Sequence, residues 1–297
     1  MDNQTNKNSA LSNSTTTGTT GIDSLLPKDM ARKAEEIGIA KVDMDFLSMS
    51  GLSVLAGSFI ALGAIFATVA LTGTSSVPWG WARIIAGIVF SLGLILVIVG
   101  GAELFTGNTL IIMAWSDRRF STVKLLRNWG IVYLGNFIGA ILTAIIVFIS
   151  KQYTFYNGGI GTTALNIGLS KVNLDFAQAL VLGILCNALV CLAVWLCMSA
   201  RTTLEKIASI VFPIAGFVAS GFEHCIANMY FIPVALFIRN WAPASFWQIT
   251  GLDAAAYNNL TWSSFFMRNL LPVTIGNIIG GVVLVGAVYW LVYLRKR

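Results

Sequence analysis

The chain has 297 residues, of which 56% are hydrophobic and only 11% are charged. Charged residues make up about 25% of an average soluble protein, and the chain instead contains several apolar runs of about 20 residues or more. These values exclude an ordinary soluble protein and predict an all-α protein that crosses a membrane several times. The net charge of +6 then reflects basic residues that flank membrane spans, so we expect no nucleic-acid partner.

The N-terminal region precedes the first apolar run and divides into two parts. Residues 1–26 begin with a polar stretch rich in Asn, Ser and Thr, which predicts a disordered tail and no cleavable signal peptide. Residues 27–41 begin with a proline and place Met30, Ala31, Ala34 and Ile37 at helical spacing. This pattern predicts a short amphipathic helix at the membrane surface.

Six membrane spans follow. The second and the fifth are 32 residues long, whereas about 20 residues cross a bilayer. Both are therefore expected to be broken helices, and Pro213, Gly216 and Gly221 supply places to break the fifth. The six predicted spans are 47–72, 84–115, 129–150, 176–199, 207–238 and 270–294.

Two pairs of motifs recur in the same order and indicate an internal duplication. Residues 101–108 (GAELFTGN) and 221–228 (GFEHCIAN) share Gly, Glu and Asn at the same positions. Residues 127–139 and 268–280 agree at seven of 13 positions. The first membrane repeat (42–150, spans 1–3) and the second (151–297, spans 4–6) each contain an odd number of spans, so the second must be inverted relative to the first. Such a duplication places a transport site where the two broken helices meet.

The distribution of basic residues predicts the orientation. Fourteen of the 19 lysines and arginines lie on the side that holds both termini. Because basic residues are enriched on the cytoplasmic side of a membrane, we expect both termini to be cytoplasmic in a multi-pass protein of the plasma or inner membrane.

His224 is the only histidine of the chain and lies beside a predicted break in a membrane span. Ionisable groups are costly there and usually functional, and an imidazole exchanges protons near neutral pH. Glu103 and Glu223 occupy matching positions in the two repeats. A bare carboxylate in the pore would repel an anion, so we interpret both as structural acceptors of hydrogen bonds from exposed amides at the helix breaks.

Five motifs, in this order along the chain, resemble the formate/nitrite transporter family and most of all its formate channels. They are FSLGLIL (90–96), GAELFTGN (101–108), LGILCNALVCLAVW (182–195), FVASGFEHCIANM (217–229) and PVTIGNIIGG (272–281). The resemblance covers nearly all of the chain from residue 22 onward. It implies an aquaporin-like protomer of six helices, a homopentamer, and one pore in each protomer.

The resemblance also implies roles for individual residues. His224 would be the central pore residue, with Thr106 at a constriction, Asn187 facing the histidine and Lys171 in the outer vestibule. Two hydrophobic constrictions would lie above and below the histidine, formed by Phe90, Leu94, Leu104, Phe105 and Phe217. At the helix breaks, structural roles are expected for Glu103, Glu223, Asn108 and Asn228.

These observations predict a channel or proton-coupled carrier for small monovalent anions, with formate as the first candidate. Nitrite and hydrosulfide are the alternatives within the family, and an aquaporin-like facilitator of neutral solutes is a more distant one. We expect no enzyme, because the chain lacks GxSxG and HExxH motifs and neighbouring side chains on a helix, such as His224 and Cys225, diverge. No cofactor or metal is expected.

Overall fold

In the computed structural model, which describes residues 24–295, the chain is a bundle of helices without a strand in that range. The predicted tail, residues 1–26, lies outside the described residues except for its last three. The elements are α1 (Pro27–Asp43), α2 (Phe46–Leu71), α3 (Trp79–Gly100), α4 (Phe105–Asn108), η1 (Thr109–Ile111), α5 (Ile112–Ser116), α6 (Thr122–Ile149), η2 (Gln152–Thr154), α7 (Gly159–Val172), α8 (Phe176–Ser199), α9 (Thr203–Ala219), α10 (Cys225–Trp241), α11 (Ala244–Thr250), η3 (Ala254–Tyr257), α12 (Trp262–Ser264), η4 (Phe265–Leu270), α13 (Leu271–Ile279), η5 (Gly280–Ala287) and η6 (Trp290–Leu294).

The prediction of several membrane spans is confirmed. Five helical stretches are long and apolar enough to cross a bilayer, namely α2, α3, α6, α8 and Ala254–Leu294, and there are up to six if the bent pair α10–α11 counts as one span. The last stretch contains the π-helical turns η4, η5 and η6. The predicted fourth span has the observed bounds of α8, whereas α6 begins seven residues before the predicted third span.

Both overlong spans are broken, as the sequence predicts. The second consists of α3 and of the short elements α4, η1 and α5, whereas the fifth consists of α9 and α10. Each break begins at a glycine with positive φ, Gly101 at 79° and Gly221 at 74°, a conformation that side chains disfavour. Pro213 lies in the interior of α9 and is not the point of the break.

The two repeats are packed in the same way. α6 lies against α2, and α13 lies against α8. Glycines make these contacts close, because a Cβ at Gly139 would collide with the Val54 carbonyl and one at Gly280 with the Ile184 carbonyl. The GxxxG motifs of the sequence therefore serve helix packing within each repeat.

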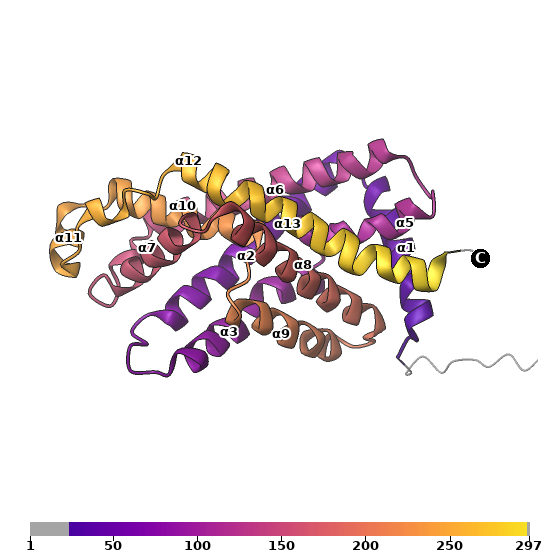
Figure 1. The fold of residues 1–297 in the computed structure, drawn as a ribbon, viewed down its shortest axis with the longest axis horizontal. Coiled ribbons are helices and arrows are strands. Elements are labelled where there is room, and N and C mark those ends of the chain that lie inside the picture. Colours follow the sequence, from indigo (N-terminus) through magenta and orange to yellow (C-terminus); the bar gives the residue numbers. More distant parts are fainter. Residues whose placement is uncertain (1–23, 296–297) are drawn as a thin grey trace, which may run out of the picture.

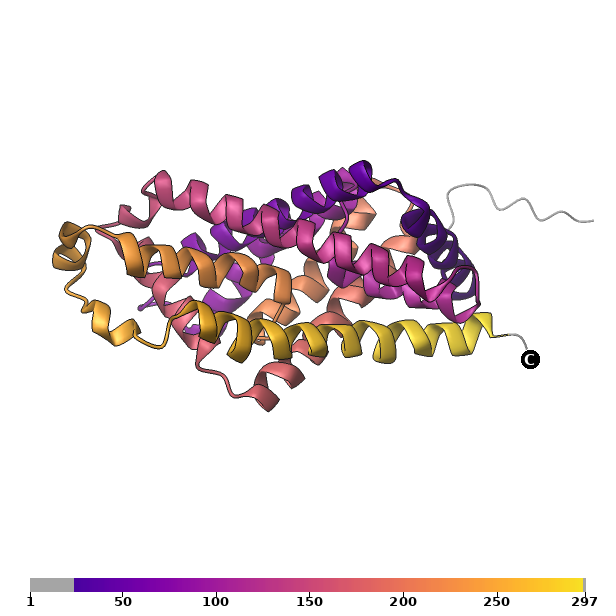
Figure 2. The same cartoon turned by 90° about the horizontal axis from the view of Figure 1, so that it is seen from above.

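The repeats are arranged in opposite directions along the molecule (Figures 1 and 2). In Figure 1, α1 and the C-terminus lie at one end of the molecule, and α7 and α11 lie at the other. α3 begins near the α7 end and α9 near the α1 end, so the two broken spans approach the middle from opposite sides. Figure 2 shows the long helix of residues 262–294, made of α12, η4, α13, η5 and η6, running along much of the length of the bundle.

A second short helix, α7, is the counterpart of the predicted surface helix. Residues 38–46 at the end of α1 and residues 168–176 at the end of α7 agree at five of nine positions. α1 is longer than predicted and buries one face, including Met30, Ala31 and Ala34, against the bundle. The domain boundary at residue 42 stays a prediction, and this correspondence favours a first repeat that includes α1.

Candidate functional site

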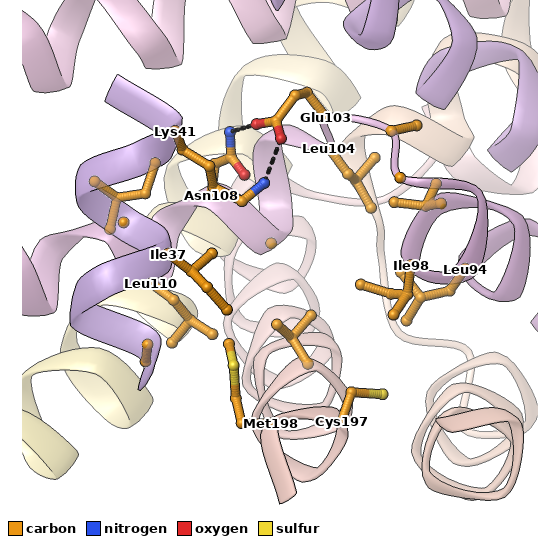
Figure 3. Close-up of a pocket in the computed structure, with 18 of the residues that line it drawn as sticks. Ile37, Lys41, Leu94, Ile98, Glu103, Leu104, Asn108, Leu110, Cys197 and Met198 are labelled. Atoms are coloured by element: carbon orange, nitrogen blue, oxygen red, sulfur yellow. Dashed lines mark hydrogen bonds and ion pairs between the residues drawn. The ribbon is translucent and has the colours of Figure 1, made fainter. Parts of the chain in front are cut away.

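At the α1 end, a buried carboxylate is held by a lysine and an asparagine. Glu103 Oε1 accepts a hydrogen bond from Lys41 Nζ at 2.6 Å, and its Oε2 accepts one from Asn108 Nδ2 at 2.8 Å (Figure 3). Asn108 also donates to Asn128 Oδ1, and Asn128 donates to the Lys41 carbonyl. Burial without partners would be costly for each of these groups, and the network supplies partners to Glu103 from both sides.

The α7 end repeats this arrangement. Glu223 Oε1 accepts from Lys171 Nζ at 2.7 Å, and its Oε2 accepts from Asn228 at 2.7 Å and from Asn269 at 3.0 Å. Asn269 also donates to the Lys171 carbonyl, as Asn128 does to that of Lys41. The two lysines, two glutamates and four asparagines thus form a duplicated polar network.

The backbone amides at the helix breaks donate to asparagines and not, as expected from the sequence, to the Glu103 and Glu223 carboxylates. The N–H of Phe105 donates to Asn136 Oδ1 at 2.9 Å, and the N–H of Cys225 donates to Asn277 Oδ1 at 2.9 Å. The side-chain oxygens of Glu103 and Glu223 accept from side chains instead, as described above. The asparagines of the GxxxG motifs therefore cap the half-helices, whereas the carboxylates anchor the break loops to α1, α7 and η4.

His224 lies at the break of the fifth span with 3% of its surface exposed. Its Nδ1 accepts a hydrogen bond from the Ala227 N–H at 3.1 Å, so that the imidazole caps the start of α10. The proton of the neutral ring is then on Nε2, which lies 3.0 Å from Thr106 Oγ1 and donates to it. The structure thus brings the lone histidine of one repeat together with a hydroxyl of the other.

Asn187 holds the backbone of Thr106 by a hydrogen bond. Its Nδ2 donates to the carbonyls of Thr106 and Asn277 and to Thr109 Oγ1. The family resemblance implied that Asn187 faces His224. Among the described residues, no hydrogen bond joins Asn187 to His224. The Oδ1 atom of Asn187 is buried and has no partner among the described residues.

Two vestibules lead towards the His224–Thr106 contact. The α7-side vestibule has a volume of about 220 Å³ and includes Phe90, Phe217, Lys171 and His224 in its lining. Phe90 and Phe217 meet edge to face with 5.6 Å between ring centroids, and Phe217 stacks on the imidazole of His224 at 5.9 Å. These rings form a narrow apolar wall directly beside the histidine.

The α1-side vestibule has a volume of about 260 Å³, and Leu94 and Leu104 are part of its lining (Figure 3). Phe105, expected at a constriction, lines neither vestibule. Its ring packs edge-on against Trp129 and Tyr133 of α6 and faces the groove between α6 and α13. The reason is that Phe105 is the first residue of α4, one position beyond the break loop that presents Leu104 to the vestibule.

Several residues of the site escaped the sequence analysis. Lys41 was counted only as a flanking charge, although its match to Lys171 is visible in residues 38–46 and 168–176. Arg83 and Phe231 also line the α7-side vestibule, and Lys33 and Lys206 line the α1-side one. No cluster of side chains suited to a metal ion occurs among residues 24–295.

Comparison with known proteins gives consistent matches over nearly the whole chain. A family model described as formate/nitrite transporter matches residues 28–291. The formate channel FocA of Escherichia coli (strain K12) is 45% identical over 275 residues, which cover 93% of this chain and 96% of the relative. The formate channel FocA of Haemophilus influenzae is 42% identical over 264 residues, which cover 88% and 92%.

Among solved structures, the fold is similar to a pentameric formate channel with formate bound, with a TM-score of 0.79 and 42% identity over 84% of this chain and 98% of that chain. A second similar structure is an FNT family ion channel, with a TM-score of 0.76 and 26% identity over 89% of this chain and 98% of the other. These relatives are channels, which confirms the expectation that the chain is not an enzyme. The multi-pass architecture, the broken helices and these matches together establish that the chain belongs to the formate/nitrite transporter family.

Proposed function

We propose that the protein is a membrane channel that conducts small monovalent anions, formate before others, past the His224–Thr106 contact. The observation that carries this proposal is a buried polar contact between the repeats, placed beside apolar walls and between two vestibules that each contain a lysine–glutamate pair. The relatives named formate channel, and the solved relative with formate bound, support formate as the substrate.

The apolar side chains beside the His224–Thr106 contact impose a dehydration cost on an anion that passes them. An unaccompanied anion loses hydration between Phe90 and Phe217 on one side and between Leu94 and Leu104 on the other, and this loss is costly. A small anion that accepts a hydrogen bond recovers part of that cost. Because His224 Nε2 donates to Thr106 Oγ1, the hydroxyl proton of Thr106 is free to point at a passing carboxylate.

Proton exchange at His224 requires a change in its hydrogen bonds. The neutral ring uses Nδ1 as the acceptor of the α10 cap, so the imidazolium forms only when Nδ1 gives up the Ala227 N–H. The imidazolium then holds a transferable proton on Nε2 next to Thr106. Its transfer to formate yields neutral formic acid and a neutral ring protonated on Nδ1, so the cap of α10 closes only after that proton leaves Nδ1 and Nε2 is protonated again. Proton coupling is therefore proposed as a cycle in which the cap of α10 opens and closes.

The same proposal covers two further residues of the substrate pathway, the orientation of the chain in the membrane and its assembly. Lys171 and Asn187 would contribute to the substrate pathway, the former in the vestibule and the latter by holding Thr106. Both termini would be cytoplasmic, which makes the α1-side vestibule the inner one and the α7-side vestibule the outer one. The protein would form a homopentamer, which the pentameric solved relative supports, and would lie in the inner membrane with one pore in each protomer.

Reconstitution tests this function directly. Purified protein in liposomes should increase the flux of formate at two pH values, with smaller increases for nitrite and hydrosulfide and none for glycerol. A larger flux of nitrite or hydrosulfide than of formate would reassign the substrate within the family. Glycerol flux equal to formate flux would instead support the neutral-solute alternative.

Cysteine labelling tests the orientation. Cysteines introduced near Lys171 and Asn258 should react with an impermeant reagent added to intact cells, whereas one near Arg118 should not. Reaction at the Arg118 region in intact cells would reverse the proposed topology.

A further inference from the structure

The α7-side vestibule contains two basic side chains that differ in how their charge is balanced. Lys171 lies 2.7 Å from Glu223, so a carboxylate neutralises it at contact distance. Arg83 has no carboxylate within ion-pair distance among the described residues. With His224 neutral, the vestibule therefore carries one net positive charge, and that charge belongs to Arg83.

The position of Arg83 on α3 directs it towards the pore. Arg83, Gly87, Phe90 and Leu94 are spaced by four, three and four residues, which places them on one face of the helix. That face packs on α9, because a Cβ at Gly87 would collide with Ala215. A headgroup anchor would lie on the opposite face of α3, whereas Arg83 lies about 10 Å outward from Phe90 on the face that leads to it.

The guanidinium of Arg83 is held in place but has spare donors. Nη2 donates to the Val218 carbonyl at 2.6 Å, in the last turn of α9. Nε is buried and has no hydrogen-bond partner among the described residues. An arginine has five N–H donors in a planar fork whose geometry matches a carboxylate. A guanidinium that is fixed at Nη2 and lines the vestibule, with N–H donors beyond the one used for Val218, is suited to hold a small carboxylate.

We propose that Arg83 forms a docking site for small carboxylates in the α7-side vestibule, and that its guanidinium, rather than the ammonium of Lys171, collects the anion ahead of the Phe90–Phe217 wall. Lys171 serves mainly to hold Glu223 and the break loop, and Glu223 masks its charge. This inference rests on the proposed anion transport and adds the residue that recruits the anion.

The test is formate uptake by liposomes containing the full-length protein, measured at low and at high ionic strength. Fields of exposed charges extend about 30 Å at 0.01 M salt but only about 3 Å at 1 M. We expect Arg83→Gln to lower uptake about fivefold at low ionic strength, the effect of one unit charge at about 4 Å in water, and to leave it nearly unchanged at high ionic strength. Arg83→Lys should retain the salt response, because it keeps both the charge and a donor for Val218.

Three controls separate docking from other effects. Arg239→Gln removes one exposed charge at the same end of the molecule and should leave the salt response unchanged. The double variant Lys171→Gln with Glu223→Gln keeps the net charge, and should lower uptake by a similar factor at every ionic strength without altering the salt response. Formamide, a neutral analogue of formic acid, should enter Arg83→Gln liposomes at the wild-type rate.

The outcomes distinguish this inference from the proposed function. Wild-type protein that carries no formate would refute the function itself. If the wild type carries formate and Arg83→Gln keeps the full salt response, or slows formamide as much as formate, the docking role is refuted and the function stands. If Arg83→Gln does not fold, the double variant decides, because its loss of the salt response would assign the recruiting charge to Lys171.

Discussion

The two break loops, residues 101–104 and 221–224, share their scaffold and differ in the side chains presented to the pore. Each begins with a glycine of positive φ and contains a glutamate paired with a lysine. At the fourth position, however, the first loop has Leu104 and the second has His224. Two residues further, Thr106 corresponds to Ile226. The duplicated residues thus hold the loops in place, and each repeat contributes one unduplicated polar group to the His224–Thr106 contact.

The largest effect on transport is expected from a substitution of His224, the residue that corresponds to Leu104 of the first repeat. His224→Asn keeps an oxygen that can cap α10, since Asn is a favoured N-cap residue, but it cannot exchange a proton near neutral pH. Formate uptake driven by an inward proton gradient should fall on the order of a thousandfold, while passive anion current persists or rises.

Formate uptake with an internal pH dye, with and without the gradient, measures this effect. Leu104→Met is the matched control in the first repeat and should retain coupled uptake. If His224→Asn still takes up formate and protons together at the wild-type rate, the histidine has a purely structural role.

The next effect concerns the duplicated lysine–glutamate pairs. Removing one partner of a buried ion pair leaves an uncompensated charge, which costs about 3 kcal/mol. The Lys171 side chain is 14% exposed and that of Lys41 is 25% exposed. Lys171→Met should therefore lower the free energy of unfolding more than Lys41→Met does.

Thermal unfolding of the purified variants measures the difference. Adding Glu223→Gln to Lys171→Met should restore part of the loss, because it removes the unpaired carboxylate. An equal loss in the two repeats would mean that burial does not decide the strength of these pairs.

A smaller effect is expected at the other unduplicated position, Thr106. Thr106→Val keeps the shape but leaves Nε2–H of His224 without its acceptor, and a hydrogen bond of this kind is worth about 1 kcal/mol. Formate flux should fall about tenfold, since the passing anion also loses its donor. Thr106→Ser keeps the hydroxyl and should retain most of the flux; a Val variant as active as the Ser variant would exclude a direct role of the hydroxyl.

The smallest effect concerns the pH dependence of stability, to which α1 contributes a buried carboxyl group that α7 lacks. Glu35 of α1 corresponds to Leu165 of α7, and burial raises the pKa of Glu35 above its ordinary value of 4.5 despite the nearby Arg119. A raised folded-state pKa means that the folded protein binds more protons than the unfolded chain, so stability declines as pH rises from 4.5 through the folded pKa.

Glu35→Gln should remove this decline, with a change below about 1 kcal/mol at neutral pH. Unfolding midpoints across mildly acidic pH measure it. A variant that keeps the wild-type pH dependence would mean that another group titrates in this range.

Much of this architecture could be predicted from sequence because it depends on local pattern. Apolar run length located the spans, and the two 32-residue runs indicated the breaks. The partners of individual side chains depend on tertiary neighbours and were less accessible. The ring of Phe105 faces α6 because it lies one residue past the break loop, which hydrophobicity alone does not reveal.

The partners of the charged residues could not be predicted from sequence either. Basic residues at span ends predict orientation, but they do not reveal which of them meets a carboxylate. Lys41 and Lys171 could have been matched by comparing residues 38–46 with 168–176. Their contacts with Glu103 and Glu223 join segments more than fifty residues apart, and only the fold brings these together.

The described side-chain partners of Glu103 and of Glu223 all lie in the same repeat as the glutamate itself, and this has a consequence for biosynthesis. Asn136 bonds to Ser53, Glu103 and Phe105, whereas Asn277 bonds to Gly183, Glu223 and Cys225. A ribosome that has delivered only the first half of the chain has already delivered every partner that Glu103 needs. The first half of the chain therefore contains both partners of its buried lysine–glutamate pair before the second half is made.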